Sequence, residues 1–245
     1  RNGWLPELDA IPGPVADAAK LMWLNYPNNP TSAVATHEDL AAAVAYCREK
    51  DIALLHDAAY SEIGYEGYRA TSCMQVDGAK DVSLEFHSLS KTYNMTGWRF
   101  GMAVGNADMI KALFQIKANL DSGIPQAIQQ MAIEALTGPQ DCVDSNVEIY
   151  QRRRDRVIKA LTTLGLTVDV PRASLYIWAR VPEGFTSAEL AARLLEETDI
   201  VVTPGSSYGQ YGEGYIRLSL TTPDEQVEKG CQRLEGWKIP APQGG

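Results

Sequence analysis

Continuous apolar runs alternate with amphipathic segments along the first half of the chain. Residues 21–25 (LMWLN) form an apolar run that ends in the Pro/Asn-rich sequence YPNNPTS, which predicts a buried strand followed by a turn. Residues 37–50 carry apolar side chains at helical spacing, and Thr36, with Asp39 three residues later, is a candidate N-cap. Three further strands are predicted in IALLHDAAY, DVSLEFHSLS and RFGMAVG. This order is typical of a mostly parallel sheet with helices on its faces.

The second half of the chain has a different pattern. Residues 106–137 have helical spacing with a break at SGIPQ, and a long charged helix is predicted over roughly residues 142–164. Beyond it, LTVDV, SLYIWARV and GYIRLSL predict strands, while SAELAARLLEET and PDEQVEKGCQRL predict helices. We therefore expect an α/β fold with a large domain over residues 1–145 and a smaller C-terminal α+β domain over residues 146–240.

Composition and charge exclude several classes of partner. The chain has 245 residues, a formal net charge of -9 and no basic block, so nucleic acid and anionic membranes are poor partners. No apolar run reaches transmembrane length, and the start of the chain does not have the pattern of a signal peptide. The four cysteines are scattered without metal-ligand spacing, which favours reduced thiols and a cytoplasmic protein. We interpret RRRDR, residues 152–156, as the solvated face of the long helix.

Polar residues follow each of the first three predicted strands. Asn29 follows the first strand, Asp57 ends the second with Tyr60 three residues later, and Ser88 and Lys91 follow the third. In open α/β sheets, ligands bind beyond the carboxyl ends of the strands. The sequence therefore predicts a ligand site at this edge of the sheet.

The residue types at this edge fit pyridoxal 5′-phosphate. Its ring nitrogen requires a carboxylate, its phenolic oxygen requires hydrogen-bond donors, and its phosphate requires a cation with hydroxyl or amide donors. Its aldehyde requires a lysine that can form a Schiff base. An acid, a tyrosine, an amide, a serine and a lysine occur together here, and Arg99 follows eight residues after Lys91.

Each of these residues also has a purely structural interpretation. An isolated lysine is usually a solvated surface residue, and an aspartate after a strand is often a turn or capping residue. The sequence GQYGEG, residues 209–214, precedes a strand and opens no helix, so we reject it as a dinucleotide-binding loop. The three histidines have no metal-ligand spacing, and we interpret His56 and His87 as satisfied core or rim histidines.

Four segments together resemble the fold-type-I pyridoxal-phosphate-dependent aminotransferases of class I and II. These segments are NYPNNPTSA, DAAY, SLSKTYNMTGWRFG and GEGYIRLSL, and the resemblance extends from residue 1 to about residue 235. Within this family, SLSKTYNMTGWR looks most like the LL-diaminopimelate aminotransferase branch.

The resemblance implies roles for the residues around the cofactor ring. Lys91 is the catalytic residue, which carries the cofactor as a Schiff base and moves the proton of the substrate. Asp57 pairs with the ring nitrogen, and Tyr60 and Asn29 donate to the ring oxygen.

The same resemblance implies an anion-binding set. Ser88 and Arg99 hold the phosphate, with Ser90 as a weaker candidate for that position. Arg217, within YIRLSL, holds the α-carboxylate of the substrate, and Asn29 lies at the substrate as well. No metal is implied.

The expected function is transamination between an amino acid and a 2-oxo acid such as 2-oxoglutarate. LL-diaminopimelate as the amino donor would place the enzyme in lysine biosynthesis, and the resemblance implies a homodimer. Two alternatives remain open: a pyridoxal-phosphate-dependent C–S β-lyase, and a non-catalytic aminotransferase-like sensor domain of a transcription regulator. Product analysis separates the aminotransferase from the β-lyase, because the first forms glutamate and the second forms pyruvate and ammonia.

Two departures from the family pattern qualify these expectations. Ser32 occupies a position where relatives usually have glycine, which costs stability if the turn requires a positive φ. Relatives also have a segment upstream of residue 1 that supplies a phosphate loop and an aromatic residue stacked on the ring. We therefore expect the 245 residues alone to bind the cofactor poorly and to have little or no activity.

Overall fold

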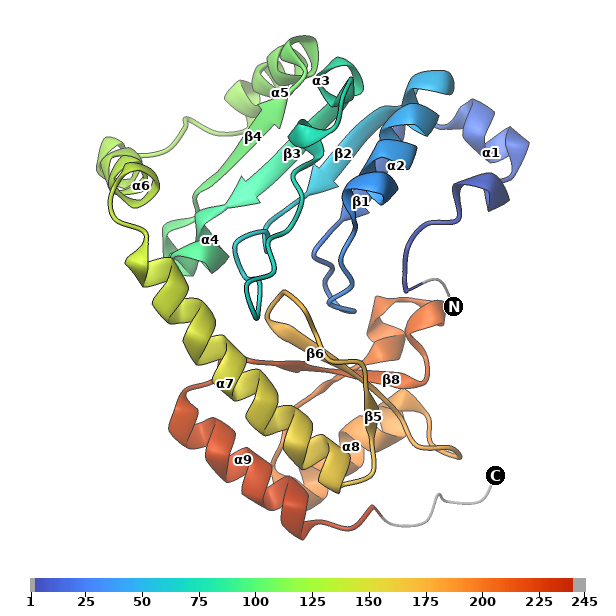
Figure 1. Ribbon diagram of the computed structural model, residues 1–245, viewed down its shortest axis with the longest axis vertical. Helices are drawn as coiled ribbons and strands as arrows, with labels where there is room; N and C mark the ends of the chain where they lie inside the picture. The colour runs from blue at the N-terminus through green and yellow to red at the C-terminus, as the bar shows by residue number, and fades with distance from the viewer. Residues whose placement is uncertain (1–2, 240–245) are drawn as a thin grey trace. The chain divides into compact units, whose positions relative to one another are not determined.

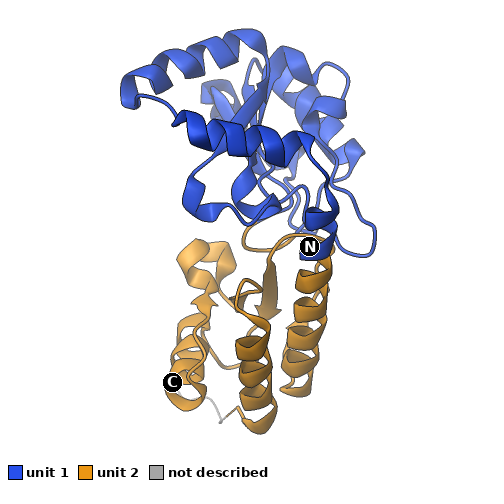
Figure 2. Cartoon of the chain, turned by 90° about the vertical axis from the view of Figure 1, so that its left-hand side faces the viewer, with its two compact units in different colours: residues 1–28, 33–146 blue, residues 29–32, 147–245 orange. Residues whose placement is uncertain are grey.

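The computed structural model describes residues 3–239 and divides the chain into two compact units. The first unit comprises residues 1–28 and 33–146, and the second comprises residues 29–32 and 147–245 (Figure 2). The short segment 29–32 thus groups with residues that follow it by more than a hundred positions in the sequence.

The first unit contains a four-stranded sheet in the order β1-β2-β3-β4 (Figure 1). Strands β1, β2 and β3 are parallel, and β4 is antiparallel to β3. The four strands predicted from the apolar runs are confirmed, with the bounds Leu21–Asn25, Ala53–Asp57, Ser83–Ser88 and Gly101–Gly105.

Helices of the first unit precede, connect and follow these strands. The α-helices are α1 (Gly13–Ala18), α2 (His37–Glu49), α3 (Ala79–Val82), α4 (Leu89–Thr92), α5 (Ala107–Leu120) and α6 (Gln126–Thr137). Short 3-10 helices lie at η1 (Leu8–Ala10), η2 (Cys73–Gln75) and η3 (Thr96–Trp98). Helix α7 (Asp141–Thr163) begins in this unit and continues in the second.

One face of the first sheet is covered and carries the core of the unit. Helix α2 begins with a capping box, in which Thr36 accepts from the backbone N–H of Asp39 and Asp39 accepts from that of Thr36. The helix buries its apolar stripe against the side chains of Leu24 and Leu54. Side chains alternate along a strand, so Trp23 lies on the opposite face, where it is 60% exposed and stacks on the ring of Phe86.

The second unit contains a smaller antiparallel sheet in the order β5-β6-β8-β7. Its strands are β5 (Thr167–Val168), β6 (Tyr176–Arg180), β7 (Thr203–Pro204) and β8 (Tyr215–Ser219). Its further helices are α8 (Ser187–Thr198), η4 (Gly205–Tyr208), η5 (Gln210–Gly212) and α9 (Asp224–Gly236). The mixture of helices and antiparallel strands confirms the predicted α+β pattern, and β7 is an additional strand that the sequence pattern did not indicate.

The interpretation of residues 152–156 as a solvated face is wrong for one of its arginines. Arg154 is only 2% exposed, and its guanidinium donates to the backbone oxygen of Pro171 at 2.9 Å and pairs with Asp155. A buried guanidinium requires such partners because an unpaired charge in the interior is costly. Arg156 is also paired, with the carboxylates of Glu228 and Glu235 on α9.

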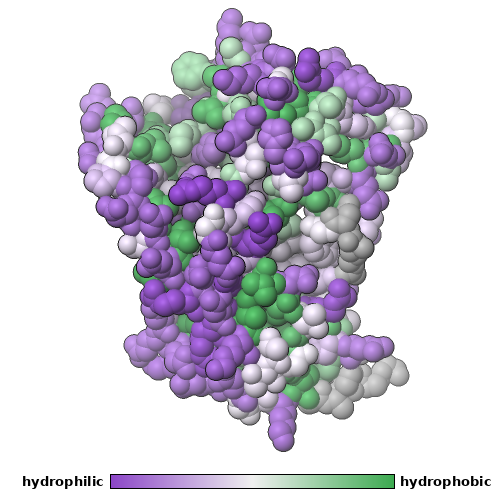
Figure 3. Space-filling view, in the orientation of Figure 1, coloured by the Kyte–Doolittle hydropathy of each residue, from purple (hydrophilic) through white to green (hydrophobic). Residues whose placement is uncertain are grey.

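Hydrophilic side chains predominate on the face of the molecule shown in Figure 3. Within residues 3–239, no helix combines the length and the apolar character that crossing a bilayer requires. The same residues contain no group of three or more His, Cys, Asp or Glu side chains placed to hold a metal ion.

Candidate functional site

Strand β3 leads directly into the segment that carries the predicted lysine. The hydroxyl of Ser88 accepts a hydrogen bond from the backbone N–H of Ser90 at 3.2 Å, which caps the one-turn helix α4. Ser90 is buried, and its backbone oxygen accepts from the hydroxyl of Thr96 at 3.1 Å. Lys91 is half-buried on α4, and its amine has no hydrogen-bond or ion-pair partner among residues 3–239. Its nitrogen is therefore available for a ligand.

Asp57 lies at the carboxyl end of the neighbouring strand β2. It is paired in register with Phe86, and Ser88 follows two positions later on β3, so Asp57 and Ser88 lie on the same face of the sheet. One carboxylate oxygen accepts from the backbone N–H of Ala59 at 3.2 Å, which leaves the other available. The side chain of Asn25 donates to the backbone oxygen of Asp57 at 2.9 Å and fixes the strand end. Tyr60, in the turn that follows, is buried.

Arg99 lies in a strained backbone position beside the start of α4. Its φ is +54°, in the left-handed region, and its guanidinium donates to the backbone oxygen of Thr96 at 2.9 Å. The next residue, Phe100, accepts from the backbone N–H of Leu89 at 3.3 Å, so this segment runs beside the first residue of α4. The side chain of Arg99 is exposed. Asp57, Tyr60, Ser88, Ser90, Lys91 and Arg99 thus all belong to the first unit.

The remaining two predicted residues, Asn29 and Arg217, meet in the second unit. Arg217 lies on β8, and its Nη1 donates to Oδ1 of Asn29 at 2.8 Å. Its guanidinium carbon lies 4.3 Å from the ring centroid of Tyr176 and 5.1 Å from that of Tyr208. Its Nε is buried and has no hydrogen-bond partner within the part of the chain that the structure describes. Because a buried N–H without an acceptor is costly, this atom indicates a site for an anionic ligand.

Residues 29–32 are held in place by a serine in a left-handed conformation. Ser32 has φ of +58°, so the turn does adopt a positive φ, which glycine accommodates more readily than serine. The serine is buried, and its hydroxyl donates to the backbone oxygen of Tyr176 at 2.7 Å. This hydrogen bond offsets part of the free-energy cost of a positive φ at serine. It also fixes the turn beside Tyr176, whose ring contacts the guanidinium of Arg217.

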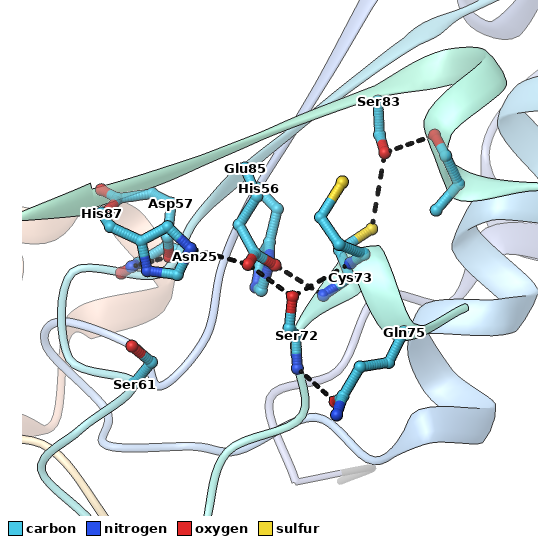
Figure 4. A network of polar contacts seen from close by, with 12 residues as sticks. Asn25, His56, Asp57, Ser61, Ser72, Cys73, Gln75, Ser83, Glu85 and His87 are labelled. Atoms are coloured by element: carbon cyan, nitrogen blue, oxygen red, sulfur yellow. Dashed lines mark hydrogen bonds and ion pairs between the residues drawn. The ribbon is translucent and has the colours of Figure 1, made fainter. Parts of the chain in front are cut away.

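The structure also reveals a buried polar network that sequence reasoning missed. Glu85, on the covered face of β3, accepts from Nδ1 of His56 at 2.9 Å and from Nε2 of His87 at 2.8 Å (Figure 4). It also accepts from the hydroxyl of Ser72 at 2.6 Å and the backbone N–H of Cys73 at 2.5 Å. The interpretation of His56 and His87 as core or rim histidines is confirmed, although only Nδ1 of His56 has a partner, and its buried Nε2 has none among the described residues.

The four donors determine the charge of this glutamate. Burial alone raises the pKa of Glu85, but the hydrogen bonds from His56, His87, Ser72 and Cys73 outweigh it and hold the pKa well below its usual range. The hydrogen bond to Glu85 raises the pKa of His87 above its usual value, against the opposing effect of burial. One signal in the sequence could have indicated the network: a glutamate inside the buried strand SLEFHS requires partners.

A mostly parallel sheet with a lysine, an acid and serines at its carboxyl edge is characteristic of the fold-type-I aminotransferases. The chain belongs to the aminotransferase class I and II family, whose model matches residues 3–234. Both the recognition of this family and the predicted fold class are confirmed.

Among curated relatives, an LL-diaminopimelate aminotransferase of Dehalococcoides mccartyi is 58% identical over 240 residues, which cover 98% of this chain and 62% of that protein. An LL-diaminopimelate aminotransferase of Moorella thermoacetica is 51% identical and is matched over 95% of this chain and 60% of its own length. The chain thus spans about three fifths of the length of these relatives.

Solved structures show that the chain shares its fold with known proteins. The apo structure of BacF from Bacillus subtilis superposes with a TM-score of 0.91 at 37% identity, over 96% of this chain and 63% of that one. A probable N-succinyldiaminopimelate aminotransferase from Thermus thermophilus superposes with a TM-score of 0.90 at 35% identity, over 96% of this chain and 63% of that one.

Proposed function

We propose that this chain forms part of a pyridoxal 5′-phosphate-dependent aminotransferase in which Lys91 attaches the cofactor. The observation that carries this proposal is the half-buried amine of Lys91, which has no partner among residues 3–239 and follows Ser88 by three residues. A lysine without an ion pair at the carboxyl edge of a parallel sheet is suited to covalent catalysis.

The residues of the first unit fit the chemistry of the cofactor. Asp57 offers a free carboxylate oxygen for a protonated ring nitrogen, and Tyr60 offers a hydroxyl for the ring oxygen. The hydroxyl of Ser88 uses a lone pair for the N–H of Ser90, so its own O–H remains available to donate to a phosphate oxygen. Arg99 supplies a guanidinium that can bind phosphate with two parallel hydrogen bonds, and Ser90 is the weaker candidate beside it.

The second unit would bind the carboxylate of the substrate through Arg217. Tyr176 and Tyr208 hold the guanidinium in one orientation, and Asn29 fixes Nη1. Nε of Arg217 is then the donor that a carboxylate would satisfy. Asn29 shares this hydrogen bond, and we propose it as a contact of the ring oxygen and of the substrate.

When bound, pyridoxal 5′-phosphate supplies an electron-accepting ring that stabilises negative charge on the α-carbon of the amino acid. Lys91 would take the proton from this α-carbon at Nζ, as a general base. Asp57 would accept a hydrogen bond from the protonated ring nitrogen through the carboxylate oxygen that Ala59 does not use. Arg217 would bind the α-carboxylate of the amino acid and restrict its orientation.

The relatives suggest a substrate. Because relatives at 58% and 51% identity are named LL-diaminopimelate aminotransferases, we propose LL-diaminopimelate as the amino donor and 2-oxoglutarate as the acceptor, in lysine biosynthesis. We further propose that residues 1–145 form part of the cofactor-binding large domain and residues 146–240 the small domain of a cytoplasmic homodimer.

The test is to incubate the full-length protein with pyridoxal 5′-phosphate, LL-diaminopimelate and 2-oxoglutarate and to measure glutamate. We expect glutamate in stoichiometric amounts with the consumed diaminopimelate. Pyruvate and ammonia from a cysteine conjugate, without glutamate, would establish the β-lyase instead. Cofactor binding without turnover of either substrate would establish the sensor domain. The expectation that residues 1–245 alone have little activity stays a prediction.

A further inference from the structure

Glu85 connects three segments that each continue into a predicted cofactor contact. His56 directly precedes Asp57 on β2, and His87 directly precedes Ser88 on β3. Ser72 and Cys73 end the connection after β2 that carries Tyr60 near its start. Asp57 and Ser88 lie on one face of the sheet, and His56, Glu85 and His87 lie on the other. One carboxylate therefore holds three segments near this edge, from the face of the sheet opposite Asp57 and Ser88.

The carboxylate of Glu85 is buried, and this strengthens its hydrogen bonds to β2, β3 and the Ser72–Cys73 turn. Its side chain is 1% exposed, and its two oxygens accept all four hydrogen bonds at distances between 2.5 and 2.9 Å. Hydrogen bonds to a buried charge are stronger than those in water, and a network of them loses more than one bond when a member is removed. His56 and Glu85 are paired in register one position before the last pair of the β2–β3 ladder, Asp57 and Phe86, so the side-chain network lies next to the end of that ladder.

The two histidines have different roles in this network. His56 is completely buried, and its Nε2 has no hydrogen-bond partner among the described residues. The side chain of His87 is 25% exposed and lines a cavity of about 120 Å³ together with Glu62, Ser88 and Tyr93. His87 is thus the more exposed of the two histidines, and we expect a substitution there to disturb the packing less than one at His56.

We propose that Glu85 is a positioning residue that holds His56, His87 and the Ser72–Cys73 turn, and thereby fixes the strand ends that present Asp57 and Ser88 to the cofactor. This inference rests on the proposed function, because it assigns the network a role in cofactor binding. A merely structural core cluster would stabilise the fold without affecting how tightly the cofactor is held.

The test measures the dissociation constant of pyridoxal 5′-phosphate by absorbance titration of the full-length protein, under conditions in which each variant is folded. Glu85→Gln keeps the shape of the side chain but replaces one carboxylate oxygen with an N–H₂ group. That group is itself a donor, so it cannot accept the hydrogen bonds that this oxygen of Glu85 receives. We expect its cofactor dissociation constant to rise about 10- to 100-fold, the range seen when groups that orient a ligand-binding residue are lost. Glu213→Gln is the matched control, because Glu213 also accepts from a hydroxyl and backbone N–H groups but lies in the second unit.

A second pair of variants decides the question if Glu85→Gln does not fold. His87→Leu removes the hydrogen bond to Glu85 at a partly exposed position, and we expect weaker cofactor binding. His87→Gln keeps an N–H donor toward Glu85, and we expect cofactor affinity within about twofold of the wild type, since one donor replaces another.

The outcomes distinguish a failure of the proposed function from a failure of the positioning role of Glu85. If the wild-type protein takes up no cofactor, the proposed function is wrong and this inference with it. If the wild type binds cofactor and either Glu85→Gln binds equally well or His87→Leu and His87→Gln bind alike, the proposed function stands and the positioning role is wrong. In folded variants, weaker binding by Glu85→Gln and by His87→Leu, with recovery in His87→Gln, supports the positioning role.

Discussion

The two units present their predicted site residues in different ways. In the first unit, the polar groups lie at strand ends and in the turns and short helix that follow, at the carboxyl edge of a mostly parallel sheet. In the second unit, Arg217 projects from within an antiparallel strand and is held by two tyrosine rings and Asn29. Strand ends can direct several short side chains toward one ligand, whereas a strand interior holds one long side chain in a fixed direction.

This difference suggests a division of labour between the units. The first unit offers an amine, a carboxylate and hydroxyls, which together suit attachment and activation of a cofactor. The second offers one oriented guanidinium with an unsatisfied N–H, which suits recognition of a carboxylate. Substitutions in the first unit should therefore alter cofactor binding and chemistry, and substitutions at Arg217 should alter the affinity for the amino acid.

The largest effect is expected at Lys91. Lys91→Ala removes the amine that attaches the cofactor and moves the substrate proton, and we expect kcat to fall by more than about 10⁴-fold, the upper end of general acid–base catalysis. Steady-state assays of the full-length protein measure this effect. Lys80→Ala, at an exposed lysine of α3 in the same unit, should retain wild-type activity. Comparable loss in both variants would contradict the assignment.

A smaller effect, confined to the substrate, is expected at Arg217. Arg217→Lys keeps the charge but loses the planar donors, and we expect kcat/KM for the amino donor to fall about 10- to 100-fold, as for the loss of a charge-assisted hydrogen bond. The cofactor dissociation constant should not change. Arg180→Lys is the control, since Arg180 lies on β6 against the ring of Tyr215 and is exposed. If Arg217→Lys weakens the cofactor but not the amino acid, the division between the units is wrong.

The next effect concerns stability and pH in the first unit. Because the pKa of His87 is raised in the folded protein, its contribution to stability is complete below about pH 6.5 and is lost as the pH rises through the folded value. The pKa of Glu85 is lowered, so its contribution is lost as the pH falls below about 4.5. Two groups near His87 also bear on its titration. The carboxylate of Glu62 favours the charged form of His87. Burial raises the pKa of Tyr93, so that this side chain stays neutral over the pH range in which His87 titrates.

His87→Gln should remove the loss of stability at rising pH, which depends on His87. It should leave the loss of stability at low pH, which depends on Glu85. The free energy of unfolding, measured by denaturant titration between about pH 5 and pH 9, should fall with rising pH in the wild type by at most about 1.5–3 kcal/mol, the contribution of a hydrogen bond to a charged group. The profile of His87→Gln should be nearly flat over the same range. Parallel profiles for the two proteins would show that His87 does not carry the titration.

The smallest effects are expected at two equivalent helix caps, one in each unit. Thr36 caps α2 and Thr186 caps α8, each in a capping box with an acidic residue three positions later. Thr36→Ala and Thr186→Ala should each cost about 1 kcal/mol of stability. Hydrogen exchange should show faster opening of α2 in the first variant and of α8 in the second. If either variant loosens both helices equally, the two units do not open independently.

Local patterns in the sequence predicted most of the fold. Apolar runs marked the strands of the first sheet because those strands are buried on the covered face, and Thr36 marked the start of α2 because a capping box is a local motif. Asn29, Asp57, Ser88 and Lys91 could be proposed as site residues because the carboxyl ends of parallel strands meet at one edge.

The features that escaped prediction depend on contacts between distant residues. Arg154 is one of several arginines in its segment, and the sequence does not show which of them is buried. Its burial depends on a hydrogen bond to the backbone oxygen of Pro171, 17 positions away. The pairing of Asn29 with Arg217 joins residues 188 positions apart. The Glu85 network combines two strands and a turn, and β7 is a two-residue strand containing a proline, which no periodicity could reveal.

The most direct test of the central claim is borohydride reduction of the full-length protein after incubation with pyridoxal 5′-phosphate, followed by peptide mapping with mass spectrometry. We predict a single pyridoxyl group, on Lys91, and none in Lys91→Ala. A pyridoxyl group on another lysine, or the same labelling in Lys91→Ala, would contradict the account.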